Sequence, residues 1–242
     1  MNPQEKAANR EAFRKMDTKG KISYILSYYW LLILVGLSVS VILISTLYNQ
    51  LTKKDPYLYA GFFNVSVGSD LENYLGEDFI QSIGLKTSKN EVRFYQNLYV
   101  SDNADAANHQ YEYASRIKLM GSIAGKQLDI VFMNKEAWDI LSGSGYLLDI
   151  QEFLSEFADL SGKLAPYLRE NEVILEDNTI EFNLNEAESY QAITQRVFNG
   201  LDASGISAMR QAGFPEEVYL GIIANTPRLE TCAVYLRYLY SD

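Results

Sequence analysis

The longest uninterrupted apolar stretch of the chain lies near its N-terminus. Residues 22–51 contain no Asp, Glu, Lys, Arg or His, and the centre of this run reads WLLILVGLSVSVILISTL. A helix rises about 1.5 Å per residue, so about 20 apolar residues cross the roughly 30 Å hydrocarbon core of a bilayer. The pattern therefore predicts a transmembrane helix over residues 22–50, preceded by a short head and followed by a soluble body.

The head, residues 1–21, is basic and is predicted to form a short helix that ends near Gly20. It carries six basic residues, whereas only Lys53 and Lys54 follow the apolar run closely. Basic residues beside a membrane span are retained in the cytoplasm. We therefore expect a single-pass protein of the cell membrane with a cytoplasmic N-terminus and an extracytoplasmic body. A cleaved signal peptide has a shorter apolar stretch followed by small residues, and VILISTLYNQ offers no such site.

Residues 51–59 are expected to form a spacer, and residues 60–242 a domain in which strands and helices alternate. The helix expected at 110–125 places the apolar residues Tyr113, Ile117 and Met120 at helical spacing. The order of the segments predicts an α/β fold. Strands are expected at 61–69, 91–100, 128–133 and 217–225, helices at 70–84 (broken around Gly76), 110–125, 135–143, 146–157 and 228–240, a hairpin at 171–184 turning at Asp177 and Asn178, and mixed structure at 190–197.

Charge divides unevenly along the chain. The first 47 residues hold six basic and three acidic residues of the chain's 21 and 31, which leaves a net charge of about −13 for the rest. Such a domain repels nucleic acid and anionic lipid headgroups, and it suits neutral or cationic ligands or a protein partner. The single cysteine, Cys232, excludes an internal disulfide and is expected to be buried, which fits a bacterial extracytoplasmic protein.

Three segments of the body resemble extracellular solute-binding proteins of the type II periplasmic-binding fold. They are DFIQSIGLKTSKNEVRFYQN, IAGKQLDIVFMNKEAWDILSGSGYLLDIQEFL and GLDASGISAMRQAGFPEEVYLGIIANTPRLETCAVYLRYL, and they follow the family's order along the chain. The resemblance implies a membrane-anchored, solute-binding-like domain, accessory to an ABC-type transporter. Full members insert a second lobe before the returning strand. Here the interval, residues 151–185, is short, so the cleft between two lobes is expected to be reduced or absent.

The inventory of catalytic residues is small. His109 is the only histidine, which argues against His-based triads and His-rich metal sites. Ser115 and Lys118 match the S-x-x-K motif of penicillin-recognising enzymes, but the accompanying S-D-N motif precedes it and the third motif lacks its glycine. The acidic clusters do not follow EF-hand spacing. We therefore expect no catalytic residue, no metal and no cofactor.

Open α/β sheets bind ligands at the carboxyl ends of their parallel strands. Short polar side chains follow three of the expected strands at Ser69, Asn134, Asn225 and Thr226, and Trp138 offers a stacking surface. These five residues are the candidate ligand site for a small solute such as a sugar or a peptide. The alternative is that the polar residues cap helices, which needs only local structure.

Two functions remain open. The first is a membrane-anchored, solute-binding-like protein. The second is a non-enzymatic interaction or scaffold subunit of a bacterial membrane complex that has lost ligand capture. A polar pocket lined by Ser69, Asn134 and Asn225 would favour the first. A contiguous exposed apolar face containing tyrosines would favour the second.

Overall fold

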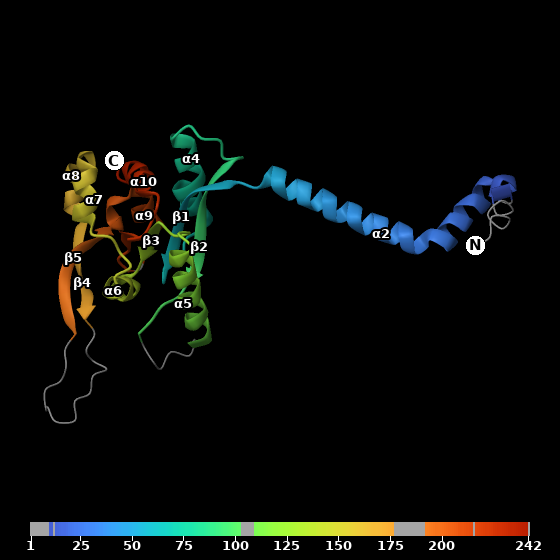
Figure 1. The fold of residues 1–242 in the computed structure, drawn as a ribbon. Helices are drawn as coiled ribbons and strands as arrows, with labels where there is room; N and C mark the ends of the chain where they lie inside the picture. Colours follow the sequence, from blue (N-terminus) through green and yellow to red (C-terminus); the bar gives the residue numbers. More distant parts are fainter. Residues whose placement is uncertain (1–9, 12, 103–108, 177–191, 215, 242) are drawn as a thin grey trace, which may run out of the picture. The chain divides into compact units, whose positions relative to one another are not determined.

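The computed structural model describes residues 10–11, 13–102, 109–176, 192–214 and 216–241 (Figure 1). The chain divides into two compact units, Met1–Lys53 and Lys54–Asp242, and each is described by itself. The second unit, called the body, contains the sheet.

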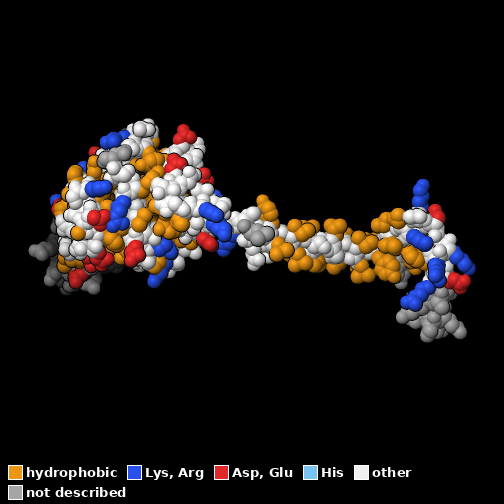
Figure 2. Space-filling model, turned by 90° about the horizontal axis from the view of Figure 1, so that it is seen from above, with side chains coloured by type: hydrophobic (Ala, Val, Ile, Leu, Met, Phe, Trp, Pro, Cys, Tyr) orange, Lys and Arg blue, Asp and Glu red, His pale blue; other side chains and the backbone are white. Residues whose placement is uncertain are grey.

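The N-terminal unit is dominated by the helix α2, Thr18–Thr52, whose hydrophobic side chains are seen in Figure 2. Its 22-residue segment Tyr29–Gln50 is long and apolar enough to cross a membrane, and none of its hydrophobic window is buried against protein. The apolar helix predicted here is confirmed, while its insertion into a membrane stays a prediction. The expected helix end near Gly20 is wrong, because Asp17 caps α2 by accepting a hydrogen bond from the Gly20 amide at 2.9 Å.

The described residues of the body form one mixed sheet of six strands, so the α/β class is confirmed. The strand order is β2-β1-β3-β6-β5-β4. β1 runs parallel to both β2 and β3, whereas β6 is antiparallel to β3 and to β5, and β5 is antiparallel to β4. The strands are β1 Asp55–Phe63, β2 Asn90–Leu98, β3 Ile130–Met133, β4 Leu168–Glu176, β5 Ile193–Asp202 and β6 Tyr219–Ile222.

Helices connect these strands and cover both faces of the sheet. The break predicted around Gly76 is confirmed as a π-helical turn, Tyr74–Asp78, where a Cβ on Gly76 would lie 2.9 Å from the Phe94 ring. The α-helices are α3 Ser69–Asn73, α4 Phe79–Ser82, α5 His109–Ala124, α6 Lys135–Gly143, α7 Ile150–Glu156, α8 Ala158–Leu164, α9 Ser207–Ala212 and α10 Leu229–Leu239, with 3-10 turns at Ala165–Tyr167 and Ala203–Gly205.

Alternate side chains of the central strands supply two hydrophobic cores. Phe62 and Phe132 stack at 5.2 Å in the core shared with α10. Phe63, Val131 and Met133 point into the other core, which α5 and α6 cover. All four residues of β3 and all four of β6 are buried, because helices cover the sheet on both sides.

The strand and spacer boundaries near residue 60 differ from the prediction. Residues 51–59 do not all form a spacer, because β1 begins at Asp55. β1 ends at Phe63, well before residue 69, because Asn64 adopts a left-handed conformation with φ of 57°.

The second hairpin strand and the turn predicted at Asp177 and Asn178 lie outside the described residues. β4 forms the first strand of that hairpin, and its partner is β5, in a segment for which mixed structure was expected.

Helix α5 presents an unexpected face to solvent. Tyr113, Ile117 and Met120 are at helical spacing, yet their exposed fractions are 68%, 52% and 59%. The side chains that pack inward are Ser115, Leu119 and Ser122. An apolar stripe at this spacing normally marks the buried side of a helix, but on α5 the stripe faces solvent.

Candidate functional site

The carboxyl ends of β1, β2 and β3 meet at one edge of the sheet, because these strands are parallel. β6 starts at the same edge, with Tyr219 opposite Met133. A hollow of about 580 Å³ opens there, which we call the carboxyl-edge hollow. It is lined by Asn64, Val65, Ser66, Asn97, Leu98, Tyr99, Tyr111, Asn134, Glu136, Phe214, Glu216, Glu217 and Val218.

One wall of the hollow is fixed by Asn64. Its side-chain amide donates to the Val100 carbonyl at 2.7 Å, and its side-chain oxygen accepts from the Val100 amide at 3.0 Å. These two bonds tie the loop after β1 to the loop after β2. Asn64 and Asn97 both adopt positive φ, which asparagine tolerates better than most residues. The Asn64 side chain is therefore committed to the scaffold.

A second wall begins at Asn134, which has two roles at once. Its side-chain oxygen caps α6 by accepting from the Ala137 amide at 3.0 Å, and its amide group donates to Glu216 at 3.3 Å. Glu136, in the first turn of α6, accepts from the Ser101 hydroxyl. The capping alternative is thus correct for Asn134, but the residue still lines the hollow.

The hollow carries negative charge. Glu136, Glu216 and Glu217 line it, and no Lys or Arg is among its described lining residues. Glu217 accepts from the Tyr219 hydroxyl. Burial, followed by this hydrogen bond, raises the pKa of Tyr219 to about 12, so the phenol remains a neutral donor at neutral pH. The carboxylates of the hollow therefore have neutral hydrogen-bond donors but no cation of their own.

Two arginines lie outside the lining of the hollow. Arg116 pairs with Glu112 at 3.0 Å and with Asp102 at 3.3 Å. Arg210 lines a smaller neighbouring hollow of about 380 Å³, which shares the wall containing Glu216 and Glu217. No described ion pair joins either arginine to these two carboxylates.

Two of the predicted site residues on this side of the body are not positioned to bind a ligand in the hollow. Ser69 is exposed at the start of α3 and does not line the hollow. Trp138 is only 2% exposed, its Nε1 donates to the Asn199 side chain at 3.0 Å, and its ring stacks on Tyr219 at 4.2 Å. Trp138 is therefore a residue of the core.

Asn225 and Thr226 lie at the opposite, amino edge of the sheet. The prediction placed them with Asn134 as if β6 ran parallel to β3, but β6 is antiparallel and Ile222 lies opposite Ile130. The Asn225 amide group donates to the Ile123 carbonyl at 2.9 Å. The five predicted residues are therefore not brought together, and only Asn134 belongs to the hollow.

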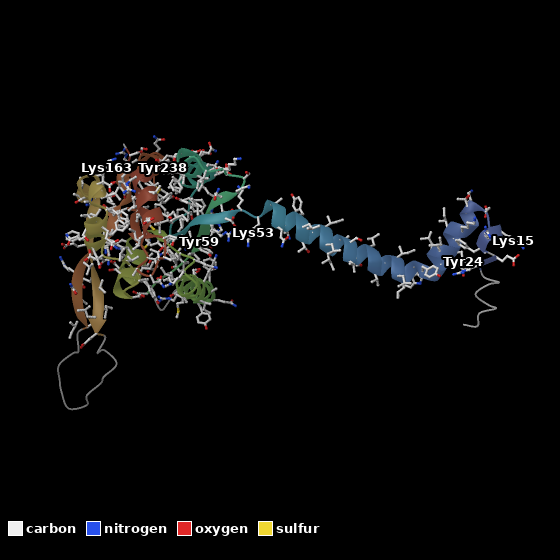
Figure 3. The ribbon with its side chains drawn as sticks, turned by 45° about the horizontal axis from the view of Figure 1, so that its top comes forward. Lys15, Tyr24, Lys53, Tyr59, Lys163 and Tyr238 are labelled. Atoms are coloured by element: carbon white, nitrogen blue, oxygen red, sulfur yellow. The ribbon has the colours of Figure 1, made fainter. Side chains whose placement is uncertain are left out.

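At that amino edge, sequence reasoning missed a buried ionic cluster around Asp129. This carboxylate is fully buried and accepts from the Tyr59 amide at 2.8 Å, from Arg228 Nε at 2.8 Å and from the Thr226 hydroxyl. The Arg228 guanidinium also lies 4.8 Å from the centre of the Tyr59 ring, which Figure 3 labels. The cluster joins β1, the start of β3 and the start of α10, so its role is structural.

Within the described part of the chain, no three His, Cys, Asp or Glu side chains converge as metal ligands. No known family model matches the chain, and neither a curated protein nor a solved structure is significantly similar to it. The resemblance to solute-binding proteins therefore stays a prediction.

Proposed function

We propose that this chain is a single-pass membrane protein whose body binds a small cationic solute in the carboxyl-edge hollow. The observation that carries the proposal is a hollow with three carboxylates and no basic lining residue among those described. Its place, at the carboxyl ends of parallel strands, is where open α/β sheets bind ligands. Its volume of about 580 Å³ lies within the range of small-molecule sites. Amines and basic amino acids or peptides fit this chemistry better than sugars do.

A role beside an ABC-type transporter is what the resemblance implies, and the order of the elements agrees with the fold of that family. Parallel β1, β2 and β3 are followed late in the chain by the returning strand β6. The segment between β3 and β6 adds helices and the pair β4–β5 to the same compact unit. A solute would then sit at an open edge of one lobe, with less of its surface buried than in a closed cleft. We therefore expect modest affinity and release without lobe opening.

Saturating the full chain, in lipid nanodiscs, with a cationic solute is expected to raise its melting temperature. At a hundred times the Kd, the shift should be about 5 to 10 °C for a body of this size. Glu216→Gln keeps the shape of the side chain but removes its charge, and should weaken binding about 10- to 100-fold. The screen compares polyamines, basic amino acids and basic dipeptides with sugars and acidic amino acids.

The matched control is Glu170→Gln, an exposed position on β4 that does not line the hollow. Equal loss of affinity in Glu170→Gln and Glu216→Gln would show a general charge effect. A response to sugars alone would contradict the cationic class. A folded chain whose melting temperature no compound of the screen changes would contradict solute binding and favour the second function, an interaction subunit.

That second function, an interaction subunit, is favoured by the exposed stripe Tyr113, Ile117 and Met120 on α5. Exposed apolar side chains are unfavourable in water, and burying them under a partner lowers the free energy of the system. Tyr111 next to the stripe is 48% exposed as well. In this reading α5 is the surface that docks on another subunit of a membrane complex.

A photo-crosslinking amino acid at Ile117 tests this reading in intact cells. We expect a discrete adduct of defined mass from position 117, because the side chain would lie inside the interface. The control position is Lys163, an exposed residue on α8 (Figure 3). No adduct from 117, or the same adducts from both positions, would argue against docking through α5.

A further inference from the structure

Lysines gather at the amino edge of the body's sheet. Lys54 directly precedes β1, Lys86 and Lys89 lie in the turn before β2, and Lys126 lies in the turn before β3. We call these four residues the lysine rim. Parallel strands begin at the same edge, and the Lys89 carbonyl accepts from the Asp55 amide at 2.7 Å. The Lys126 carbonyl accepts from the Arg228 guanidinium, so a backbone bond holds one turn in place and a side-chain bond holds the other.

The charge of the lysine rim is largely unbalanced. Lys54 lies 3.8 Å from Glu77, but no described carboxylate pairs with Lys86, Lys89 or Lys126, which are exposed. Two exposed carboxylates belong to this region, those of Asp55, next to Lys54 in the chain, and of Glu77. By contrast, six other arginines and lysines of the body, including Arg228 at this same edge, are held by carboxylates within 3.5 Å: Arg93, Arg116, Lys135, Arg169, Arg228 and Arg237.

The rim is tied by the chain to the apolar helix. α2 ends at Thr52 and β1 begins at Asp55, so only Lys53 and Lys54 separate them. Three residues of extended chain reach at most about 11 Å. This is close to the Debye length of roughly 8 to 10 Å at physiological ionic strength. If α2 is inserted, Lys54 at the start of β1 therefore stays close to the headgroups.

We propose that the lysine rim docks the body on anionic phospholipid headgroups, an inference that rests on the proposed role of α2 as membrane anchor. The body as a whole is negative and is repelled by such a surface, so only the orientation that presents the rim is attractive. The carboxyl-edge hollow lies at the opposite edge of the sheet. Docking through the rim thus directs the acidic hollow away from the lipid and toward incoming cationic solute.

Quenching of a fluorescent label by headgroup-nitroxide lipid tests the docking in nanodiscs that contain the full chain. Ser88→Cys places the label, exposed, between Lys86 and Lys89, and Gln211→Cys places it on α9 beyond the carboxyl edge. The native Cys232 is buried, and burial raises the pKa of its thiol, so it stays unlabelled.

Changing the lipid from zwitterionic to about 30% anionic should raise quenching at position 88 about two-fold and leave position 211 unchanged. About 0.5 M salt should reverse the rise. Lys86→Glu combined with Lys89→Glu should remove it, whereas Lys163→Glu on α8 should not.

Resistance to alkaline extraction reports separately on the anchor. A chain that resists extraction but whose quenching at 88 ignores lipid charge and salt overturns the docking and leaves the anchor standing. The same rise at positions 88 and 211 also overturns it, because the body would then have no preferred edge. A chain that alkali extracts contradicts the anchor, and the docking inference falls with it.

Discussion

Replacing Asp129 with alanine is expected to lower the free energy of unfolding by about 3 to 5 kcal/mol. The carboxylate is fully buried and accepts hydrogen bonds from three donors: the Tyr59 amide, the Thr226 hydroxyl and Arg228 Nε. Its removal leaves the Arg228 charge, whose side chain is 25% exposed, without a carboxylate. Removing one partner of a buried ion pair lowers the free energy of unfolding by more than the intact pair contributes to it, because the remaining charge stays desolvated.

Denaturant unfolding of the full chain in micelles, followed by tryptophan fluorescence, measures the loss. Asp129→Asn should fall between wild type and alanine, because the amide oxygen still accepts but the charge is gone. The matched control is Asp159→Ala, whose carboxylate binds Arg237 at 2.7 and 2.9 Å but on the surface. Solvent screens that pair, so only a small change is expected. Equal losses at positions 129 and 159 would show that burial does not decide the outcome.

Local signals explain which parts of this fold the sequence could predict. Helix α6 was predicted with the boundaries that it has, because Asn134 caps it and the apolar residues Ala137, Trp138 and Leu141 recur at helical spacing. β3 and β6 were found as short apolar runs, as expected for strands covered on both faces. Each of these patterns involves only a few neighbouring residues of the sequence.

The direction in which a strand pairs and the rotation of a helix about its axis are not determined by neighbouring residues in the sequence. A four-residue apolar run such as β6 reads the same whether it pairs parallel or antiparallel, so Asn225 and Thr226 were assigned to the wrong edge. The rotation of α5 depends on a distant contact as well. The Ser115 hydroxyl accepts from the Tyr99 amide at 3.1 Å, which turns the polar side of the helix inward.

The same limit explains which residues of the hollow were missed. Glu216 and Glu217 precede β6, and they reach the carboxyl edge only because β6 is antiparallel to β3. A search for polar residues that directly follow each strand finds Asn134 but overlooks polar residues that come before a strand. The available signal was the acidic pair itself, followed directly by an apolar run.

Gly200→Ala is expected to destabilise the body by about 3 kcal/mol, because the added methyl overlaps Trp138. A Cβ at position 200 would lie 2.6 Å from Cζ2 and 2.7 Å from Cε2 of this ring. The ring cannot easily retreat, since Tyr219 stacks on it at 4.2 Å and Asn199 holds its Nε1. The control is Gly162→Ala in α8, where a Cβ meets no atom within 4 Å and should stabilise by up to about 1 kcal/mol.

A double-mutant cycle assigns this cost to the Trp138 ring. Phenylalanine has a smaller ring that lacks Cζ2, the atom nearest to the new methyl, so Gly200→Ala should cost less in a Trp138→Phe background, with a coupling of about 2 kcal/mol. Additive losses would place the strain elsewhere. The cycle also tests the original assignment of Trp138 to the ligand site. If the ring is a core residue, a folded Trp138→Phe chain keeps the melting-temperature response to cationic solute that Glu216→Gln reduces. Trp138 then acts on folding, whereas Glu216 acts on solute binding.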